Sequence, residues 1–408
     1  MERTHCGGCG EPRDWIETFL DLGETPLAND LPRTQDQNQV LYPLQVGVCN
    51  VCWLAQMMHT PAADEVFGGD YTFYSSTSPA LVAYHTNYAL ELLNRYRDSN
   101  GIVVEVACND GDLLRHFHNA GRRAFGIDPA AGPVAVARDR GLTVEHTALT
   151  HESAYEFRKM YGPASLVIAN HVTAHVIDLL DFLAGIHSLL AQDGHAILEV
   201  QYLPDLLTGN HFDHVYHEHR YFFSLSSLLA AATAVNLVAA DVRLNDQQGG
   251  SMQVTFVRDS FAIRDSDGLG RVSALLVREQ LVRHMSAYGG AQMRAERVRD
   301  RLLEVLESQR AAGLVVAGYG MPAKATTLLN FCGIDRRLVS HIVDTTPAKI
   351  GRYAPGVKIP VVGPNDRNEP DTYLVLVWNY LRGILQRESR FQASGGEFIV
   401  PLPVPVVL

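Results

Sequence analysis

The sequence lacks any apolar run that approaches the roughly 20 residues a helix needs to cross a bilayer. The first residues, Met1 to Cys6, also lack the apolar stretch of a secretory signal. Basic residues are in the minority, because 34 lysines and arginines face 45 acids and leave a formal net charge of −11. Nucleic-acid partners favour a basic surface. We therefore expect a cytoplasmic protein with neither a nucleic-acid nor a membrane partner.

Length and composition predict several globular domains. Hydrophobic residues make up 47 % and charged residues 19 % of the sequence, which is typical of folded and not of disordered chains. A chain of 408 residues exceeds one ordinary hydrophobic core. Residues 1–65 are rich in turns and poor in long periodic segments. We expect this module to precede domains over 66–240 and 241–408, in a monomer or a weak homodimer.

Four of the six cysteines form two Cys-x-x-Cys pairs, Cys6 with Cys9 and Cys49 with Cys52. Four thiolates are the tetrahedral set that Zn²⁺ prefers in structural sites. The alternatives are a redox pair or a disulfide framework, and both are disfavoured by a cytosolic setting and by the duplicated motif. The sequence therefore predicts a zinc ion with a closed ligand shell that holds the fold and does no chemistry.

Strands alternate with helices after residue 101. An apolar strand over 102–107, a turn over 108–111 and a helix start near Asp112 are followed by a second strand that ends at Asp128. This alternation predicts an α/β fold, a mostly parallel Rossmann-like sheet with helices on both faces. A similar but smaller unit begins with a strand over 314–320 and continues with strands at 341–344 and 372–377.

The first turn favours S-adenosylmethionine over a dinucleotide. Asp128 at a strand end can accept hydrogen bonds from the ribose hydroxyls of an adenosine. Glu105, Asp110 and Asp112 flank the turn. Such acids would repel a pyrophosphate but suit a cationic sulfonium. The competing interpretation is an α/β domain that binds no nucleotide.

The second unit carries Gly318 and Gly320 in a turn that looks like a dinucleotide site, with Asp344 at the next strand end. A glycine pair is weak evidence, and Pro322 departs from a dinucleotide fingerprint. Lys324, near a helix N-terminus, could instead hold a sugar-nucleotide phosphate. The alternative is a solvated surface lysine.

The densest titratable segment is 211–222, which follows a strand and is not the H-E-x-x-H zinc motif. Carbon methylation beside a carbonyl needs a base and hydrogen-bond donors for the enolate oxygen. His219 or Tyr216 could be the base, Glu218 could orient it, and His175 follows another strand on the same expected face. The other histidines of the segment are interpreted as surface or capping residues: His211, His214 and His217.

Together these motifs resemble the deoxysugar C-methyltransferases of antibiotic biosynthesis, especially those that methylate C-3′ of dTDP-linked 4-keto-6-deoxysugars. The resemblance runs over nearly the whole chain, through both cysteine pairs and segments 105–111, 174–175, 216–219, 249–251 and 318–324. It implies a structural zinc module, a central S-adenosylmethionine domain and a C-terminal Rossmann-like domain, with the dTDP-sugar bound between the last two. It also implies a histidine base that matches His219.

Within this resemblance we expect three groups of site residues. Catalysis is expected from His219, Glu218, Tyr216 and His175, with an upstream tyrosine that is either Tyr71 or Tyr74. Cofactor contacts are expected from Glu105, Ala107, Asn109, Gly111, Asp128 and Asn170. Substrate contacts are expected from Tyr74, Tyr216 and Lys324.

Three residues near this expected site depart from the family pattern: His171, Thr173 and Ile177. They bear on which sugar is bound and which carbon is methylated. The alternatives to a C-methyltransferase are a bifunctional enzyme that also reduces the ketone with NADPH, an O- or N-methyltransferase, and a non-catalytic scaffold on the same fold.

Overall fold

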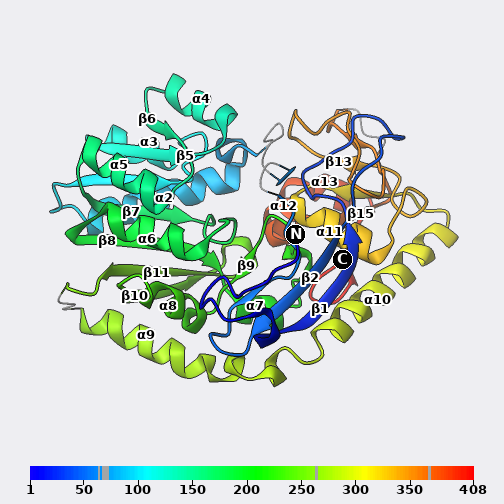
Figure 1. The fold of residues 1–408 in the computed structure, drawn as a ribbon. Coiled ribbons are helices and arrows are strands. Elements are labelled where there is room, and N and C mark those ends of the chain that lie inside the picture. Colours follow the sequence, from blue (N-terminus) through cyan, green and yellow to red (C-terminus); the bar gives the residue numbers. More distant parts are fainter. Residues whose placement is uncertain (63–64, 67–72, 262–264, 366–368) are drawn as a thin grey trace.

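The computed structural model describes residues 1–62, 65–66, 73–261, 265–365 and 369–408, and over these residues it forms three β-sheets (Figure 1). Within the described ranges, none of the helices has the length and apolar character that a bilayer crossing requires.

The central sheet has seven strands in the order β10-β11-β8-β7-β4-β5-β6. All run parallel except β11, which is antiparallel to both of its neighbours. The strands are β4 (Ile102–Val106), β5 (Ala124–Asp128), β6 (Thr143–His146), β7 (Ala164–Asn170), β8 (Leu190–Gln201), β10 (Leu237–Asn245) and β11 (Ser251–Arg258). The strand order reverses between β4 and β7, and ligands of such sheets bind outside the carboxyl ends of the strands at this switch point.

Helices cover both faces of the central sheet because successive strand residues point to opposite sides. Val103 packs among residues of α2 (Pro79–Arg95), α3 (Leu114–Asn119) and α4 (Ala131–Asp139). Val104 faces the other core, which α5, α6, α8 and α9 complete: His151–Tyr161, Leu179–Leu189, Leu225–Thr233 and Ser266–Arg278. The fold class expected from the alternating strands and helices is confirmed here.

The N-terminal module contains a sheet of order β1-β2-β3-β9. Its strands are β1 (Ile16–Thr25), β2 (Tyr42–Cys49), β3 (Ala55–Met57) and β9 (Tyr221–Phe222). The expectation of a module without long regular segments was wrong, since β1 has ten residues and β2 has eight. The polar residues of β1 alternate with buried ones on a half-exposed sheet, so its composition resembles that of a loop.

The C-terminal sheet has the order β14-β13-β12-β15-β16-β17 and is parallel except for β17. Its strands are Val361–Val362 (β14), Ile342–Val343 (β13), Val316–Tyr319 (β12), Thr372–Val375 (β15), Glu397–Val400 (β16) and Val406–Val407 (β17). The helices around it are α10 (Ala291–Ala311), α11 (Ala323–Cys332), α12 (Leu381–Arg387) and α13 (Ser389–Ala393). Its order also reverses at its first strand, between β12 and β15.

The boundary expected at residue 240, between the second and third domains, differs from the structure. Strand β11 belongs to the central sheet, which therefore extends past residue 240 to Arg258. The stretch over 273–311 is divided between two helices, because α9 ends at Arg278 and α10 begins at Ala291. Just after α9 ends, the buried carboxylate of Glu279 accepts the N–H groups of Leu225 and Ser226 at the start of α8 (2.6 and 2.7 Å).

The three units share buried surfaces. One hydrophobic core joins β1 and β2 to the short helix α7 (Leu203–Thr208) and to α10 and α11. The hydroxyl of Thr326 in α11 donates to the carbonyl of Ala28 (3.0 Å), and that of Thr327 donates to the carbonyl of Val215 (2.7 Å). Helix α11 therefore packs against both the N-terminal module and the segment expected to carry the base.

Candidate active site and metal centre

The four cysteines of the paired motifs lie together, with their sulfur atoms within 4.8 Å of one another. Sγ of Cys6 is 3.5 Å from that of Cys52, and Sγ of Cys9 is 3.7 Å from that of Cys49. A tetrahedral zinc ion with bonds of about 2.3 Å places its sulfur ligands about 3.8 Å apart. The amide of Gln56 donates to Sγ of Cys6 (3.2 Å), a contact that stabilises a thiolate. The cluster fits zinc and has no further ligand position.

The turn after β4 is built around Asp128 at the end of β5. Its carboxylate accepts the N–H of Asn109 (2.8 Å) and that of Ala130 (2.7 Å). Burial raises the pKa of Asp128, and these two bonds oppose the rise. Gly111 in this turn has φ of +77°, and a Cβ there would lie 2.2 Å from Cδ1 of Leu142. The turn therefore requires glycine at this position.

Glu105 and Asn170 are among the side chains of this region that have polar atoms without a partner within the described residues. Oε2 of the buried Glu105 accepts no hydrogen bond, and burial and the nearby Asp112 hold the pKa of Glu105 well above its ordinary value. Both polar atoms of the Asn170 side chain, at the end of β7, are buried and unpaired. Unsatisfied polar atoms at the switch point are what a ligand with ribose and amino groups would satisfy.

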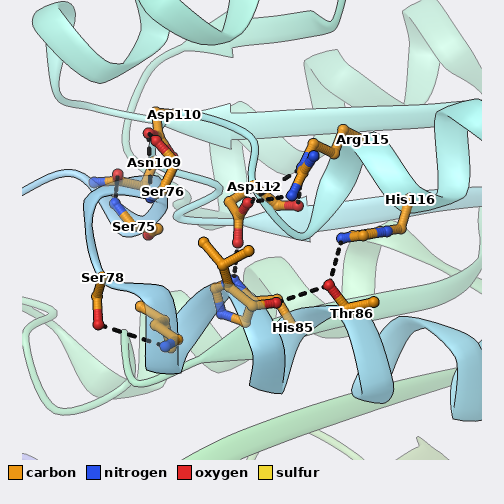
Figure 2. Close-up of polar contacts among 12 residues, drawn as sticks. Ser75, Ser76, Ser78, His85, Thr86, Asn109, Asp110, Asp112, Arg115 and His116 are labelled. Atoms are coloured by element: carbon orange, nitrogen blue, oxygen red, sulfur yellow. Dashed lines mark hydrogen bonds and ion pairs between the residues drawn. The ribbon is translucent and has the colours of Figure 1, made fainter. Parts of the chain in front are cut away.

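The other two acids of the turn, Asp112 and Asp110, are paired with basic side chains, which the sequence did not lead us to expect. Asp112 binds Nδ1 of His85 (2.8 Å) and Arg115 (2.8 Å), as Figure 2 shows. Asp110 lies 3.5 Å from Arg140 and accepts the hydroxyl of Ser76. Both acids are neutralised by cations, so Glu105 and Asp128 remain as the acids of the turn without such partners.

Asn109 anchors the segment before α2. Its side-chain oxygen accepts the N–H of Ser75 (2.9 Å) and its amide donates to the carbonyl of Phe73 (3.1 Å). The side chain predicted to contact the cofactor is thus used to fix residues 73–75 onto the turn, where Figure 2 shows Ser75 beside Asn109. Ala107 and Asn109 both adopt positive φ (56° and 52°), which turns the backbone toward the switch point.

Tyr74 lies on the side of the turn that faces α4. Its hydroxyl would be 2.7 Å from a Cβ built on Gly132, in the helix that follows Asp128. The ring neighbours of His219 are other side chains, namely His175, Tyr216 and Phe222. Tyr71, the alternative upstream tyrosine, falls outside the described residues.

His219 is held as a neutral imidazole. Its Nδ1 is 2.8 Å from the carbonyl oxygen of His214, which can only accept, so Nδ1 carries the proton. Nε2 then carries a lone pair, which accepts a hydrogen bond from the hydroxyl of Tyr216 at 2.7 Å. The ring of His175 lies 4.9 Å away. Burial lowers the pKa of His219 well below its ordinary value and that of His175 to about 4.

The carboxylate of Glu218 points away from His219, the expected base. Its two oxygens accept the amide of Asn29 at 2.8 and 2.9 Å, and burial raises its pKa to about 7. The charge of Lys349 opposes this rise in pKa. The structure therefore places the carboxylate of Glu218 on the N-terminal module and not on the ring of His219, which corrects the orienting contact expected from the sequence.

Lys324 is buried at the switch point of the C-terminal sheet, with 5 % of its surface exposed. Its Nζ donates to Asn379 (2.7 Å) and lies 3.8 Å from the ring centre of Trp378. Burial lowers its pKa to about 8, and the charge of Asp213 acts in the opposite direction. The alternative of a solvated surface lysine was wrong.

The histidines taken for surface residues are also packed inside. The rings of His211 and His214 lie 4.5 and 5.6 Å from that of Trp378, whose Nε1 donates to Asp213 (2.7 Å). His217 is 1 % exposed and binds the carbonyl of Pro43 (3.2 Å). A segment dense in histidines is therefore the buried contact between the central and C-terminal domains.

Sequence reasoning missed Glu199, a fully buried acid in β8. Its carboxylate lies between Tyr84, His171 and Gln253, at 2.5, 3.2 and 2.9 Å. A single acid inside the apolar strand 196–200 was the available signal.

Comparisons with known proteins agree with this architecture. The C-methyltransferase NovU of Streptomyces niveus is 36 % identical over 410 residues, which cover 99 % of this chain and 96 % of NovU. Family models match a zinc binding domain at residues 6–67, a methyltransferase domain at 82–241 and a C-methyltransferase C-terminal domain at 246–403.

Solved methyltransferase structures match less than half of the chain. The S-adenosylmethionine complex of magnesium protoporphyrin IX methyltransferase from Synechocystis is 15 % identical and covers 43 % of this chain and 79 % of that one, with a TM-score of 0.33. An S-adenosylmethionine-dependent methyltransferase from Clostridium acetobutylicum is 12 % identical and covers 43 % and 92 %, with a TM-score of 0.34. From its full-length similarity to NovU and its three matching domains, the chain belongs to the C-methyltransferase family, as an S-adenosylmethionine-dependent enzyme with a zinc-binding N-terminal domain.

Proposed function

We propose that the protein methylates the carbon next to the 4-keto group of a dTDP-linked deoxysugar. The observation that carries this proposal is the neutral His219, whose Nε2 lone pair meets the hydroxyl of Tyr216 beside a second buried histidine, His175. In this neutral form, Nε2 can accept a proton but has none to donate. Carbon methylation needs a proton acceptor, whereas a ready oxygen or nitrogen nucleophile needs less help.

In the proposed reaction, His219 takes the proton of the C–H bond beside the ketone, directly or through Tyr216. The C–H electron pair becomes a carbon–carbon double bond and the carbonyl pair moves onto oxygen. S-adenosylmethionine supplies an electrophilic methyl group. The enolate carbon forms a bond to that methyl as the carbonyl is restored, and the sulfur keeps the electron pair of the broken S–C bond.

The nucleotide end of the substrate would lie at the carboxyl ends of β12 and β15. Lys324 supplies a buried positive charge there, at the start of α11, and we propose that it attracts the phosphates. A 4-keto group adjoins both C-3′ and C-5′. The sequence resemblance favours C-3′, and the position of the new methyl in the product's NMR spectrum decides between them.

The proposal is tested by replacing the base. Wild type and His219→Asn are incubated in D₂O with dTDP-4-keto-6-deoxyglucose, with and without S-adenosylmethionine. We expect wild type to exchange the proton beside the ketone and to form a methylated sugar, and His219→Asn to lose both activities by at least about 10²-fold. His118→Asn, on the exposed side of α3, is the control that keeps both. Wild-type rates in His219→Asn would disprove the assignment of the base.

A further inference from the structure

The carboxylate of Glu199 collects four hydrogen bonds although it has no exposed surface. Oε2 accepts from the hydroxyl of Tyr84 (2.5 Å) and the amide of Gln253 (2.9 Å). Oε1 accepts from Nε2 of His171 (3.2 Å) and the amide of Asn245 (3.4 Å). The donors come from α2, the end of β7, β10 and β11, so the network ties together the carboxyl edge of the central sheet.

Glu199 is ionised. Burial alone would raise its pKa, but the hydrogen bond and charge of His171, followed by the bonds from Gln253 and Tyr84, lower it. A buried carboxylate requires a counter-charge, since an unpaired one would cost several kcal/mol, on the order of 3 or more. Tyr84, Gln253 and Asn245 are neutral donors. Of the four donors, His171 is the one that can carry a positive charge, and its Nε2 lies 3.2 Å from Oε1 of Glu199.

His171 stands where a bound ketone could reach it. It follows Asn170 at the switch point, and its N–H donates to the carbonyl of Glu199 (2.7 Å). Its φ of +52° lies in the left-handed region, which a non-glycine residue adopts at a cost and usually at functional sites. Its side chain is 26 % exposed, whereas that of Glu199 is closed off.

His171 also lies within electrostatic reach of the proposed base. Its charge contributes to the low pKa of both His175 and His219. Those two rings are neutral because burial disfavours their charged forms. Of the eight histidines from residue 171 to residue 219, His171 is the one that the described structure pairs with a carboxylate.

We propose that the imidazolium of His171, held by Glu199, donates its Nδ1–H to the carbonyl oxygen of the substrate as the enolate forms. This inference rests on the proposed function. When the C–H proton leaves for the base, the carbonyl oxygen gains the electron pair, and a fixed donor stabilises that charge. Nε2–H stays on Glu199, so Nδ1–H is the group left to reach the oxygen. Glu199 is a positioning residue, because it acts through His171.

The first test separates charge from hydrogen bonding. Proton exchange in D₂O and methyl transfer are measured with dTDP-4-keto-6-deoxyglucose for wild type, His171→Ala and His171→Asn. We expect the alanine variant to lose about 10²-fold in both rates. Asparagine offers a neutral donor, so it should recover to within about 10-fold of wild type. Binding of S-adenosylhomocysteine, measured by calorimetry, should stay within about 3-fold in both variants, a change of under 1 kcal/mol.

The pH profile gives a second readout that a merely structural role would not change. The titratable groups that face His171 are Glu199 from β8, Tyr84 from α2, and His175, His214 and His219 from the loops. Wild-type exchange should fall on the alkaline side as His171 loses its proton. His171→Asn should lack this fall, and an unchanged alkaline limb would overturn the inference.

A third measurement needs no substrate. In protein labelled with ¹⁵N-histidine and saturated with S-adenosylhomocysteine, both ring nitrogens of His171 should show the imidazolium shift at neutral pH. Glu199→Gln should abolish it, whereas Tyr84→Phe, which removes one neutral donor, should keep it. A neutral His171 in wild type refutes the inference whatever the substrate. If wild type leaves the sugar probe unchanged while this signature is present, the proposed substrate is wrong and the ion pair stands.

Discussion

Acidification should destabilise the protein through histidines that are buried without charge. Burial lowers the pKa of His175, His211 and His217 from an ordinary 6.5 to about 4 in each case. Between these values the unfolded chain binds protons that the folded chain does not, so stability falls as the pH falls from 6.5 to 4. Each histidine accounts for about 3 kcal/mol, or about 10 kcal/mol together.

Glu218 acts in the opposite direction. Its pKa is raised from 4.5 to about 7, so the folded chain holds a proton that the unfolded chain has lost. The resulting penalty, about 3 kcal/mol at pH 7, disappears as the pH falls to 4.5. For these four groups together, the loss on going from pH 7 to pH 4 is about 7 kcal/mol, comparable to the entire stability of many domains. Near pH 5.5 these four groups contribute about two protons to the slope.

The assay is urea unfolding at intervals from pH 7 to pH 5, followed by tryptophan fluorescence, with released zinc monitored by a chromogenic chelator to exclude loss of metal. His217→Gln is the informative variant, since a glutamine amide can still donate to the carbonyl of Pro43. We expect its slope to be about one proton smaller than that of wild type. The reasoning fails if the wild-type midpoint is constant or rises on acidification, or if His217→Gln keeps the wild-type slope.

Two further substitutions test the metal centre and the cofactor turn. Cys49→Ser should lower the zinc content measured by mass spectrometry, whereas Cys332→Ser, at a buried thiol outside the cluster, should keep one zinc per chain. Gly111→Ala should weaken S-adenosylhomocysteine binding at least about 10-fold by calorimetry, because its Cβ would collide with Leu142. Gly141→Ala has a similar φ of +82° but open space, and should lose stability without losing affinity. Retained zinc in the first case, or equal binding by the two alanine variants, would contradict these expectations.

Local patterns in the sequence predicted the parts of the fold that depend on local chemistry. The strand over 102–107 is an apolar run bounded by glycine, and it is observed as β4. The four thiols were identified from the spacing of Cys6, Cys9, Cys49 and Cys52, since two such motifs supply the four thiolates that a structural zinc ion prefers. The acid that ends β5, Asp128, has the position that the pattern predicted.

Features that depend on distant partners could not be predicted in this way. The hydrogen bonds of Glu199 come from residues such as Tyr84 and Gln253, which lie more than 50 positions away along the chain, one in each direction. The local sequence therefore does not indicate them. From the sequence, the negative charge of Asp110 was expected to face the cofactor. In the structure it is paired with Arg140, which lies 30 positions away along the chain. The packing of His211 and His214 likewise depends on Trp378 of another domain, and that of His217 depends on Pro43 of the N-terminal module.

The pairing of β3 with β9 makes the metal module and the catalytic segment parts of one sheet. Ala55 opposes Phe222 and Gln56 opposes Tyr221, so a strand that starts three residues after Cys52 lies beside one that starts two residues after His219. Transplanting the central domain alone would carry over the turn after β4 but leave the proposed base, His219, on an unanchored loop. Such a fragment could still capture the methyl donor while losing the means to use it, so this enzyme cannot be shortened to its methyltransferase domain.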